Sequence, residues 1–146
     1  MRSWPEYYIG SDMADQSYSR TNNCVFSLHY HMVLVTKQRR AVLTSEMLKA
    51  AEVAIRERCD VRGGALEEFG AEADHIHILF SLPPAEAVAG FANAVKTTTS
   101  RRLRRDFPSL KRLGGALWSP SYFVSSCGSA PLETIKEYVR SQERPD

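Results

Sequence analysis

One alternating stretch, Asp74-His75-Ile76-His77-Ile78-Leu79-Phe80, constrains the fold most. Alternate residues of a β-strand face the same side, so His75 and His77 would lie side by side while their apolar neighbours enter the core. Two adjacent imidazoles supply half of a metal site. A lone His-x-His pair, however, is more often two ordinary surface or hydrogen-bonded histidines. The metal interpretation therefore depends on partners elsewhere in the chain.

Composition indicates one domain of ordinary size, with 146 residues of which 43% are hydrophobic. The three cysteines form no Cys-x-x-Cys pair, which argues against a disulfide framework or a zinc knuckle and suits a reducing cytoplasm. No apolar run approaches the roughly 20 residues of a membrane helix, so we expect no membrane association. Residues 1–23 are polar and lack a period, which predicts a flexible N-terminal arm before a domain at 24–146.

Charge is unevenly distributed, although the net charge is only +2. Residues 93–112 carry seven basic side chains against the single acid Asp106, whereas residues 46–74 are predominantly acidic. A polyanion would therefore meet one favourable face and one unfavourable face.

The periodicity predicts seven elements in the order β-α-β-β-α-β-α. They are strands at 24–36, 65–71, 75–82 and 122–127, a helix that starts at a cap at 44 or 45 and stops at the glycines 63–64, and helices at 85–106 and 129–142. This order is that of a ferredoxin-like (RRM-like) α+β sandwich with an antiparallel sheet, helices on one face and an added C-terminal helix. The strands at 24–36 and 75–82 would be central, and parity places their histidines His29, His31, His75 and His77 on the free face.

The last predicted helix carries Tyr138 and Gln142. Four residues are just over one helical turn, so both side chains share a face. By itself, a Tyr-x-x-x-Gln spacing is more often a packing tyrosine followed by a solvated glutamine.

Four separated motifs together resemble the TnpA-type single-tyrosine transposases of small bacterial insertion sequences, which belong to the His-hydrophobic-His endonuclease superfamily. The motifs are Tyr30-His31-x-Val33-x-Val35-Thr36-Lys37-x-Arg39-Arg40, His75-Ile76-His77, Trp118-x-Pro120-Ser121-Tyr122 and Tyr138-Val139-Arg140-Ser141-Gln142. The chain departs from the family pattern at Ala73, where proline is usual, at Gln38, where tyrosine is frequent, and in its longer N-terminal arm.

The resemblance implies an enzyme that cuts and rejoins single-stranded DNA at insertion-sequence ends. Tyr138 would form a covalent 5′-phosphotyrosine intermediate, and His75, His77 and Gln142 would hold a divalent metal, Mg²⁺ or Mn²⁺. His31 is similar to a family position near the active-site face. The family also implies a DNA hairpin as substrate, a homodimer whose active sites are completed in trans, and action on the bacterial nucleoid.

The basic side chains of residues 93–112, which we call the basic stripe, would bind the DNA backbone. Phosphates would be neutralised by Lys96, Arg101, Arg104 and Arg105, and Tyr122 or Trp118 would stack on bases. Residues 97–100 would add contacts to the DNA. The competing interpretation of the stripe is a solvated helix face.

Three other functions compete with this hypothesis. A replication initiator or relaxase of the same superfamily is usually larger than this chain, and a domesticated relative would act on chromosomal palindromes. A non-catalytic single-stranded nucleic-acid-binding module of RRM-like fold would carry aromatic pairs on the open face of its central strands, where this chain has histidines.

Overall fold

The computed structural model describes residues 19–21, 24–126 and 138–142. Its strands are β1 (Ser19–Thr21), β2 (Cys24–Phe26), β3 (His29–Val35), β4 (Ala65–Glu72), β5 (His75–Ser81) and β6 (Phe123–Ser126). Its helices are the 3₁₀ turn η2 (Lys37–Arg39), α2 (Ser45–Val61), α3 (Val88–Asp106) and α4 (Pro108–Lys111), and residues 138–141 are also helical.

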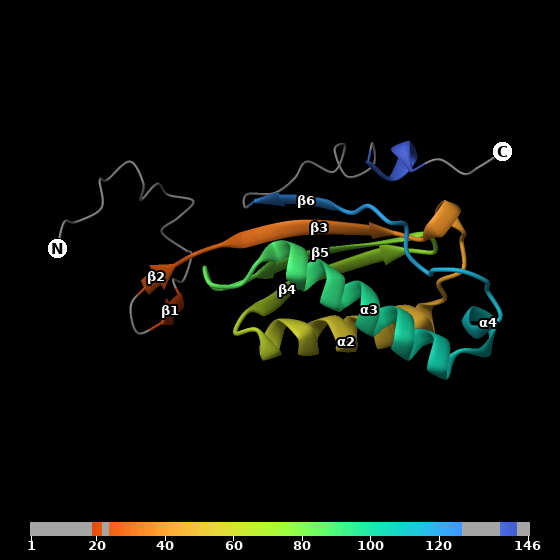
Figure 1. Cartoon of the computed structure of the whole chain (residues 1–146), viewed down its shortest axis with the longest axis horizontal. Coiled ribbons are helices and arrows are strands. Elements are labelled where there is room, and N and C mark those ends of the chain that lie inside the picture. Colours follow the sequence, from red (N-terminus) through yellow and green to blue (C-terminus); the bar gives the residue numbers. More distant parts are fainter. Residues whose placement is uncertain (1–18, 22–23, 127–137, 143–146) are drawn as a thin grey trace.

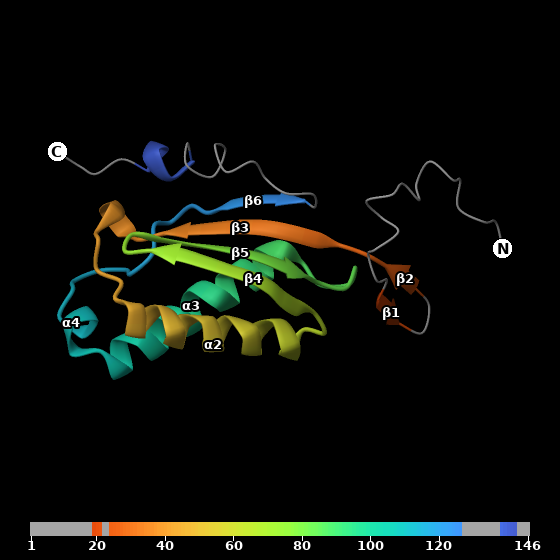
Figure 2. The ribbon, with the colours of Figure 1, turned by 180° about the vertical axis from the view of Figure 1, so that it is seen from behind.

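The main sheet confirms the predicted ferredoxin-like topology. Its four strands are antiparallel in the order β4-β5-β3-β6, so β5 and β3 are central. Helices α2 and α3 cover one face, and the helical turn at 138–141 lies over the other (Figures 1 and 2). The order β3-α2-β4-β5-α3-β6 is the predicted split βαβ arrangement.

The first predicted strand, 24–36, is wrong as a single element. It divides into β2, which pairs with β1 in a separate two-stranded sheet, and β3, which joins the main sheet. The β3–β5 ladder ends at the pair His29 and Ser81, because β5 stops just before Pro83 and Pro84, which lack the N–H that a ladder needs. The predicted arm at 1–23 thus includes β1 at its end, and the rest of it lies outside the described residues.

The helix side of the sheet holds the main core. Strand residues alternate as predicted, and the buried set from the central strands is Met32, Leu34, Ile76, Ile78 and Phe80. Against them α2 packs Met47, Ala51, Ile55 and Cys59, and α3 packs Phe91, Ala92, Val95 and Leu103. Burial raises the pKa of the Cys59 thiol to about 12, so this cysteine is a core residue and not a nucleophile.

Helix boundaries follow local chemistry. Helix α2 begins after Thr44, whose hydroxyl accepts a hydrogen bond from the Met47 amide at 3.3 Å. Helix α3 begins three residues later than predicted, and Pro108 opens α4, because proline is suited to the first turn of a helix. Within the described ranges, no helix has both the length and the apolar character needed to cross a membrane.

The other face of the sheet is partly covered, although the sequence predicted it to be free. Val33 and Val35 are fully buried there beneath Val139, with Phe123 and Tyr138 packed beside them. Covering these two valines removes apolar surface from water, which stabilises the docked helical turn. The remaining part of the predicted last helix, 129–137, lies outside the described residues.

Candidate active site

His75 and His77 share the sheet face that the parity argument predicted. In the β3–β5 register they lie opposite Val35 and Val33, whose side chains are on the face away from α2 and α3. Their ring centroids are 6.2 Å apart with an interplanar angle of 27°. The strand therefore presents two neighbouring imidazoles, as a metal site requires.

The tautomer of His75 follows from its neighbour Asp74. The Nδ1 atom of His75 lies 2.8 Å from Oδ1 of Asp74, so Nδ1 donates its proton to the carboxylate and Nε2 keeps a lone pair. Burial by itself would raise the pKa of Asp74, but the hydrogen bonds and charges of His75 and Arg39 lower it below the usual carboxyl value. This pair is the carboxylate–histidine arrangement that orients metal-binding imidazoles.

The imidazole of His77 lies over a residue without a side chain. Gly70 is its partner on β4, and a Cβ atom there would overlap Cε1 and Nε2 of His77 and lie 3.1 Å from Nδ1. Burial, and after it the charges of His75 and His31, lowers the pKa of His77. The ring is therefore neutral at neutral pH, which is the form that ligates a metal.

Gly70→Ala is expected to displace the His77 ring with little effect on the fold. The added methyl group meets the mobile end of a side chain, so the imidazole moves and the strand does not. We expect a weakening of Mn²⁺ binding by about 10-fold or more, in the range known for the loss of groups that orient metal ligands. Calorimetric titration with Mn²⁺ measures it, and Gly114→Ala, which meets no atom within 4 Å, is the control. Equal affinities in the two variants would contradict the prediction.

Carboxylates add to this site in a way the sequence reasoning missed. Glu72 lies opposite His75 in the β4–β5 hairpin, and one ligand atom each from Glu72, Asp74 and His75 lie within 4.8 Å of one another. Imidazole nitrogen together with carboxylate oxygen suits Mn²⁺ and, with more oxygen, Mg²⁺. The donors present therefore fit a divalent cation. The hairpin register was the signal, since it fixes which residue of β4 faces His75.

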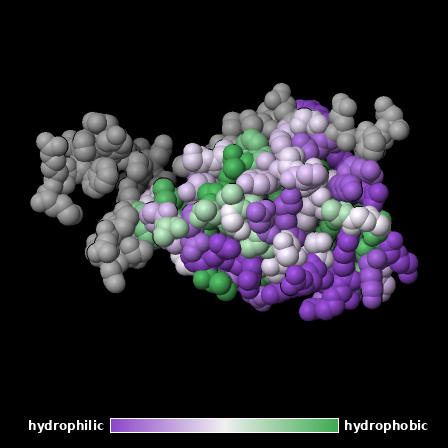
Figure 3. Space-filling view, viewed as in Figure 1, coloured by the Kyte–Doolittle hydropathy of each residue, from purple (hydrophilic) through white to green (hydrophobic). Residues whose placement is uncertain are grey.

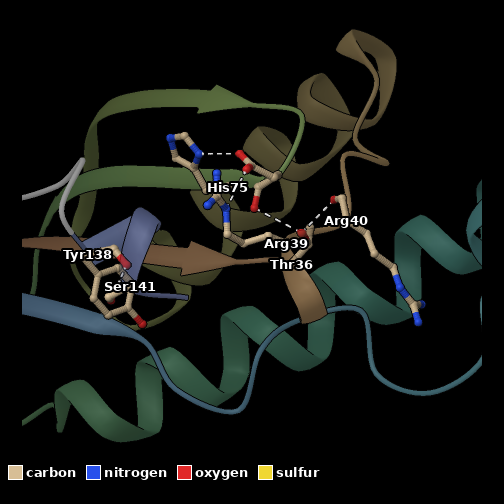
Figure 4. A network of polar contacts seen from close by, with 7 residues as sticks. Thr36, Arg39, Arg40, His75, Tyr138 and Ser141 are labelled. Atoms are coloured by element: carbon tan, nitrogen blue, oxygen red, sulfur yellow. Dashed lines mark hydrogen bonds and ion pairs between the residues drawn. The ribbon is translucent and has the colours of Figure 1, made fainter. Parts of the chain in front are cut away.

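Tyr138 and Gln142 are near each other but not at the histidines. Gln142 Oε1 accepts hydrogen bonds from Ser119 at 3.2 Å and Ser121 at 3.1 Å. The Tyr138 hydroxyl bonds to Ser121 at 3.2 Å, and its ring packs on Phe123 of β6 with centroids 5.4 Å apart. Strand β3 separates β6 from the β5 strand of His75, and in Figure 4 Tyr138 and His75 lie apart.

The Tyr138 hydroxyl is held in its protonated form in this arrangement. Burial raises its pKa, against a smaller opposing effect of the hydrogen bond with Ser121. A tyrosine nucleophile must lose its proton on attack, so it needs a different environment to react. The structure thus brings together His75 and His77, and separately Tyr138 and Gln142, but not the two pairs.

His31 lies on the same sheet face, as its resemblance to an active-site position implied. It is 8% exposed, and neither ring nitrogen has a hydrogen-bond partner among the described residues. Ser125, its partner on β6, has a buried hydroxyl that also has no hydrogen-bond partner among the described residues. The position opposite His31 on β5 is Leu79, two residues from His77, which makes His31 a diagonal neighbour of His77.

His31→Leu is expected to leave the free energy of unfolding unchanged or to raise it. A buried polar group without a partner costs about 1–3 kcal/mol, and leucine removes that cost at similar volume. Urea unfolding at neutral pH measures it. As a comparison, His29→Leu should destabilise or be neutral, because His29 pairs with Glu67 and is a structural histidine. A loss of stability in His31→Leu larger than that in His29→Leu would show that His31 is a satisfied core residue.

The predicted DNA-binding side chains on α3 have mixed environments. Lys96 donates to the Pro120 carbonyl at 3.1 Å and Arg104 donates to the Gly115 carbonyl, so both fasten the loop before β6. Arg105 pairs with Asp106 at 2.8 Å, and Arg101 is exposed. Helix α3 covers the sheet face opposite the histidines. Hydrophilic side chains gather at the end of the molecule where α3 and α4 lie (Figure 3).

The DNA contact suggested for Trp118 is wrong, and within residues 97–100 the contact suggested for Thr99 is wrong too. Trp118 is 3% exposed, and its Nε1 donates to the hydroxyl of the buried Thr99 at 2.8 Å, so neither side chain can meet a base. The position of Trp118 in a loop near Pro120 predicts an exposed side chain. An indole whose N–H has a hydrogen-bond partner can instead be buried in the core, as Trp118 is. Tyr122 is half-buried against the helix-side core.

Comparison with known proteins gives a consistent result. The family described as "Transposase IS200 like" matches residues 24–142. The ISDra2 transposase TnpA of Deinococcus radiodurans is 31% identical over 120 residues, which are 81% of this chain and 86% of that protein. The transposase for insertion sequence element IS200 of Salmonella typhimurium is 29% identical over 119 residues, covering 80% and 78% of the two chains.

Solved structures agree with the sequence comparison. A crystal structure of a Deinococcus radiodurans protein assigned as a transposase superposes with a TM-score of 0.80 at 29% identity, covering 87% of this chain and 99% of that one. A REP-associated tyrosine transposase bound to a REP hairpin has a TM-score of 0.53 at 13% identity, covering 76% and 61%, which is a likeness of fold. With the family match spanning nearly the whole described domain, the chain belongs to the IS200-like transposase family.

Proposed function

We propose that this transposase cuts and rejoins single-stranded DNA at insertion-sequence ends through a covalent bond to Tyr138. The Tyr138 hydroxyl loses its proton as its oxygen bonds to a backbone phosphorus, the bond from phosphorus to the 3′-oxygen breaks, and the 3′-oxygen takes up a proton. A 5′-phosphotyrosine and a free 3′-hydroxyl result. Because the phosphodiester energy is conserved, a 3′-hydroxyl can reverse the step and join a new strand.

The observation that carries the proposal is the oriented histidine pair. Asp74 leaves Nε2 of His75 free to ligate, and the space above Gly70 admits the neutral ring of His77. His75, His77 and Gln142 would hold Mg²⁺ or Mn²⁺, with the carboxylate of Glu72 as a further donor. A bound cation would polarise the scissile phosphate and offset the charge that develops on it.

We further propose that the active sites are completed between two copies of the chain in a homodimer. Within one chain, Tyr138 and Gln142 are bonded to Ser119 and Ser121 on the β6 side of the sheet. A helical turn that leaves the Ser119 and Ser121 contacts of its own chain could instead reach the histidines of a second copy. The exchange would also remove the protonated Tyr138 from the environment that raises its pKa.

We propose that exposed basic side chains near the C-terminal end of α3 bind the DNA backbone. Arg101 and Arg105 are exposed and can meet phosphates directly, whereas Lys96 and Arg104 would have to share their loop carbonyls. Tyr122 is half-buried against the helix-side core, so only part of its side chain is open to a base. A protein of this fold has been solved with a REP hairpin, which supports a hairpin as the substrate.

The alternative of a non-catalytic RRM-like module is less favoured by the structure. The aromatic side chains Tyr30 and Phe80 of the central strands stack on each other, with centroids 5.5 Å apart, on the helix side. The opposite face carries histidines and is partly covered by Val139. An RRM-like surface would instead expose aromatics there.

The experiment incubates the full chain with single-stranded DNA that carries a hairpin, in Mg²⁺, in Mn²⁺ and in EDTA, followed by a denaturing gel. We expect a covalent protein–DNA adduct with either metal and none in EDTA. Hairpin binding without an adduct in any metal would overturn the proposal and favour a binding module. An adduct with chromosomal palindromes but not with insertion-sequence ends would indicate a domesticated relative.

A further inference from the structure

The turn that follows β3 has an unfavourable backbone conformation. Inside η2, Gln38 has φ 62° and ψ 19°, and Arg39 has φ 53°. These are left-handed values, which crowd the Cβ atom of any residue other than glycine. Two consecutive residues of this kind persist only where surrounding contacts fix them.

Hydrogen bonds attach this turn to the β4–β5 hairpin and to the loop before β6. The Thr36 amide donates to the Asp74 carbonyl at 3.0 Å, and the Thr36 hydroxyl lies 2.8 Å from the Arg40 carbonyl and 3.2 Å from that of Asp74. The Lys37 amide donates to the Leu117 carbonyl at 2.8 Å. The turn is therefore fixed directly beside Asp74, and Figure 4 shows Thr36 and Arg39 close to His75.

The left-handed turn delivers the Arg39 guanidinium to the Asp74 carboxylate. Nε of Arg39 lies 3.3 Å from Oδ2 of Asp74, while Oδ1 of the same carboxylate lies 2.8 Å from Nδ1 of His75. One carboxylate oxygen is thus assigned to the arginine and the other to the imidazole. All three side chains are largely buried, with exposed fractions of 25%, 15% and 11%, so solvent competes little for these bonds.

Without Arg39, the Asp74 carboxylate could adopt two other arrangements. Its side chain could rotate about χ2, or it could turn an oxygen toward a cation, since Asp74, Glu72 and His75 already offer ligand atoms within 4.8 Å of one another. Either change would release Nδ1 of His75 and allow the other tautomer, in which Nε2 carries the proton and cannot ligate.

We propose that Arg39 is a positioning residue for His75, acting through Asp74 to hold the imidazole with its proton on Nδ1. The guanidinium occupies Oδ2 and so keeps Oδ1 on the ring. The metal part of this inference rests on the proposed function, whereas the tautomer part does not. The competing explanation is an ion pair that only fastens the turn to the hairpin.

The test uses the full chain with ¹⁵N-labelled histidine. In the wild type, we expect His75 to be in the Nδ1–H tautomer in NMR spectra at a pH where the ring is neutral. In Arg39→Gln, the Nδ1–H population should fall, and the dissociation constant for Mn²⁺, measured by electron paramagnetic resonance, should rise by about 10- to 100-fold. Arg39→Lys, which keeps a charged donor, should restore part of both. The matched control is Arg56→Gln, which breaks an exposed ion pair with Glu52 on α2 and should change neither.

An Arg39→Gln chain with a lower melting temperature but a wild-type tautomer and wild-type Mn²⁺ affinity would overturn the proposal. If that variant does not fold, Gln38→Gly supplies a background with the left-handed strain relieved, in which Arg39→Gln is measured in the same way. A wild-type chain that shows the Nδ1–H tautomer yet forms no DNA adduct would refute the proposed function while leaving the positioning role in place.

Discussion

Replacing Tyr138 with phenylalanine is expected to abolish the covalent DNA adduct while the chain stays folded. The ring packs on Phe123 and would keep that contact, and the lost hydroxyl removes one hydrogen bond, with Ser121, worth about 0.5–1.5 kcal/mol. Denaturing gels measure the adduct, and thermal unfolding measures the stability. Tyr30→Phe, a half-buried tyrosine on the helix side, is the control and should form the adduct normally. An adduct in Tyr138→Phe would identify a different nucleophile.

Mixing two inactive variants shows whether the nucleophile acts in trans. Tyr138→Phe supplies intact histidines, and His75→Ala supplies an intact tyrosine. If a dimer exchanges its tyrosine helices, random pairing restores about a quarter of the wild-type sites. The adduct must then contain only the His75→Ala chain, which a size tag reveals. If no activity returns after the subunits have mixed, the tyrosine acts on the metal site of its own chain and the proposed exchange is wrong.

The double variant His75→Ala with His77→Ala is expected to lose Mn²⁺ binding and to reduce adduct formation by at least about 100-fold, as removal of a main electrostatic stabiliser does. Both rings lie on the side of β5 that faces away from α2 and α3, so the apolar face of that strand, Ile76, Ile78 and Phe80, remains packed. Titration with Mn²⁺ and the gel assay give the two readouts.

His29→Ala is the matched control for this variant. His29 lies on β3 and faces the same side of the sheet as His75 and His77. Its ring, however, pairs with Glu67 and with Ser27, the latter at 3.0 Å. It should bind Mn²⁺ and form the adduct as the wild type does. Full activity of the histidine double variant in Mg²⁺ would show that the cation, if one is used, is held elsewhere.

Strand periodicity predicted the sheet faces well because side-chain direction along a strand is fixed by the backbone. The assignment of His75 and His77 to one face and of Ile76 to the core needed no tertiary information. The same periodicity could not show where a strand leaves its sheet. The break between β2 and β3 depends on where β5 ends, at Ser81, which is far along the chain from its partner His29.

The surroundings of the site depended on contacts that periodicity does not contain. Glu72 and Gly70 face the histidines because of the β4–β5 register, which includes a bulge between Leu66 and Glu68. Arg39 reaches Asp74 through a left-handed turn that no local propensity favours. Long amphipathic side chains were the least predictable, since Lys96 serves a loop carbonyl as readily as a phosphate.

The sequence by itself determined the fold class and the facing pair His75 and His77, because both follow from residue order and strand geometry, and its four separated motifs indicated the family. Only the tertiary structure decided that Asp74 selects the tautomer of His75, that Trp118 is a core residue, and that Tyr138 and Gln142 bond to serines across β3 from the histidines. The physical reason is that these outcomes are set by hydrogen-bond partners and burial, which arise when segments distant in sequence pack together.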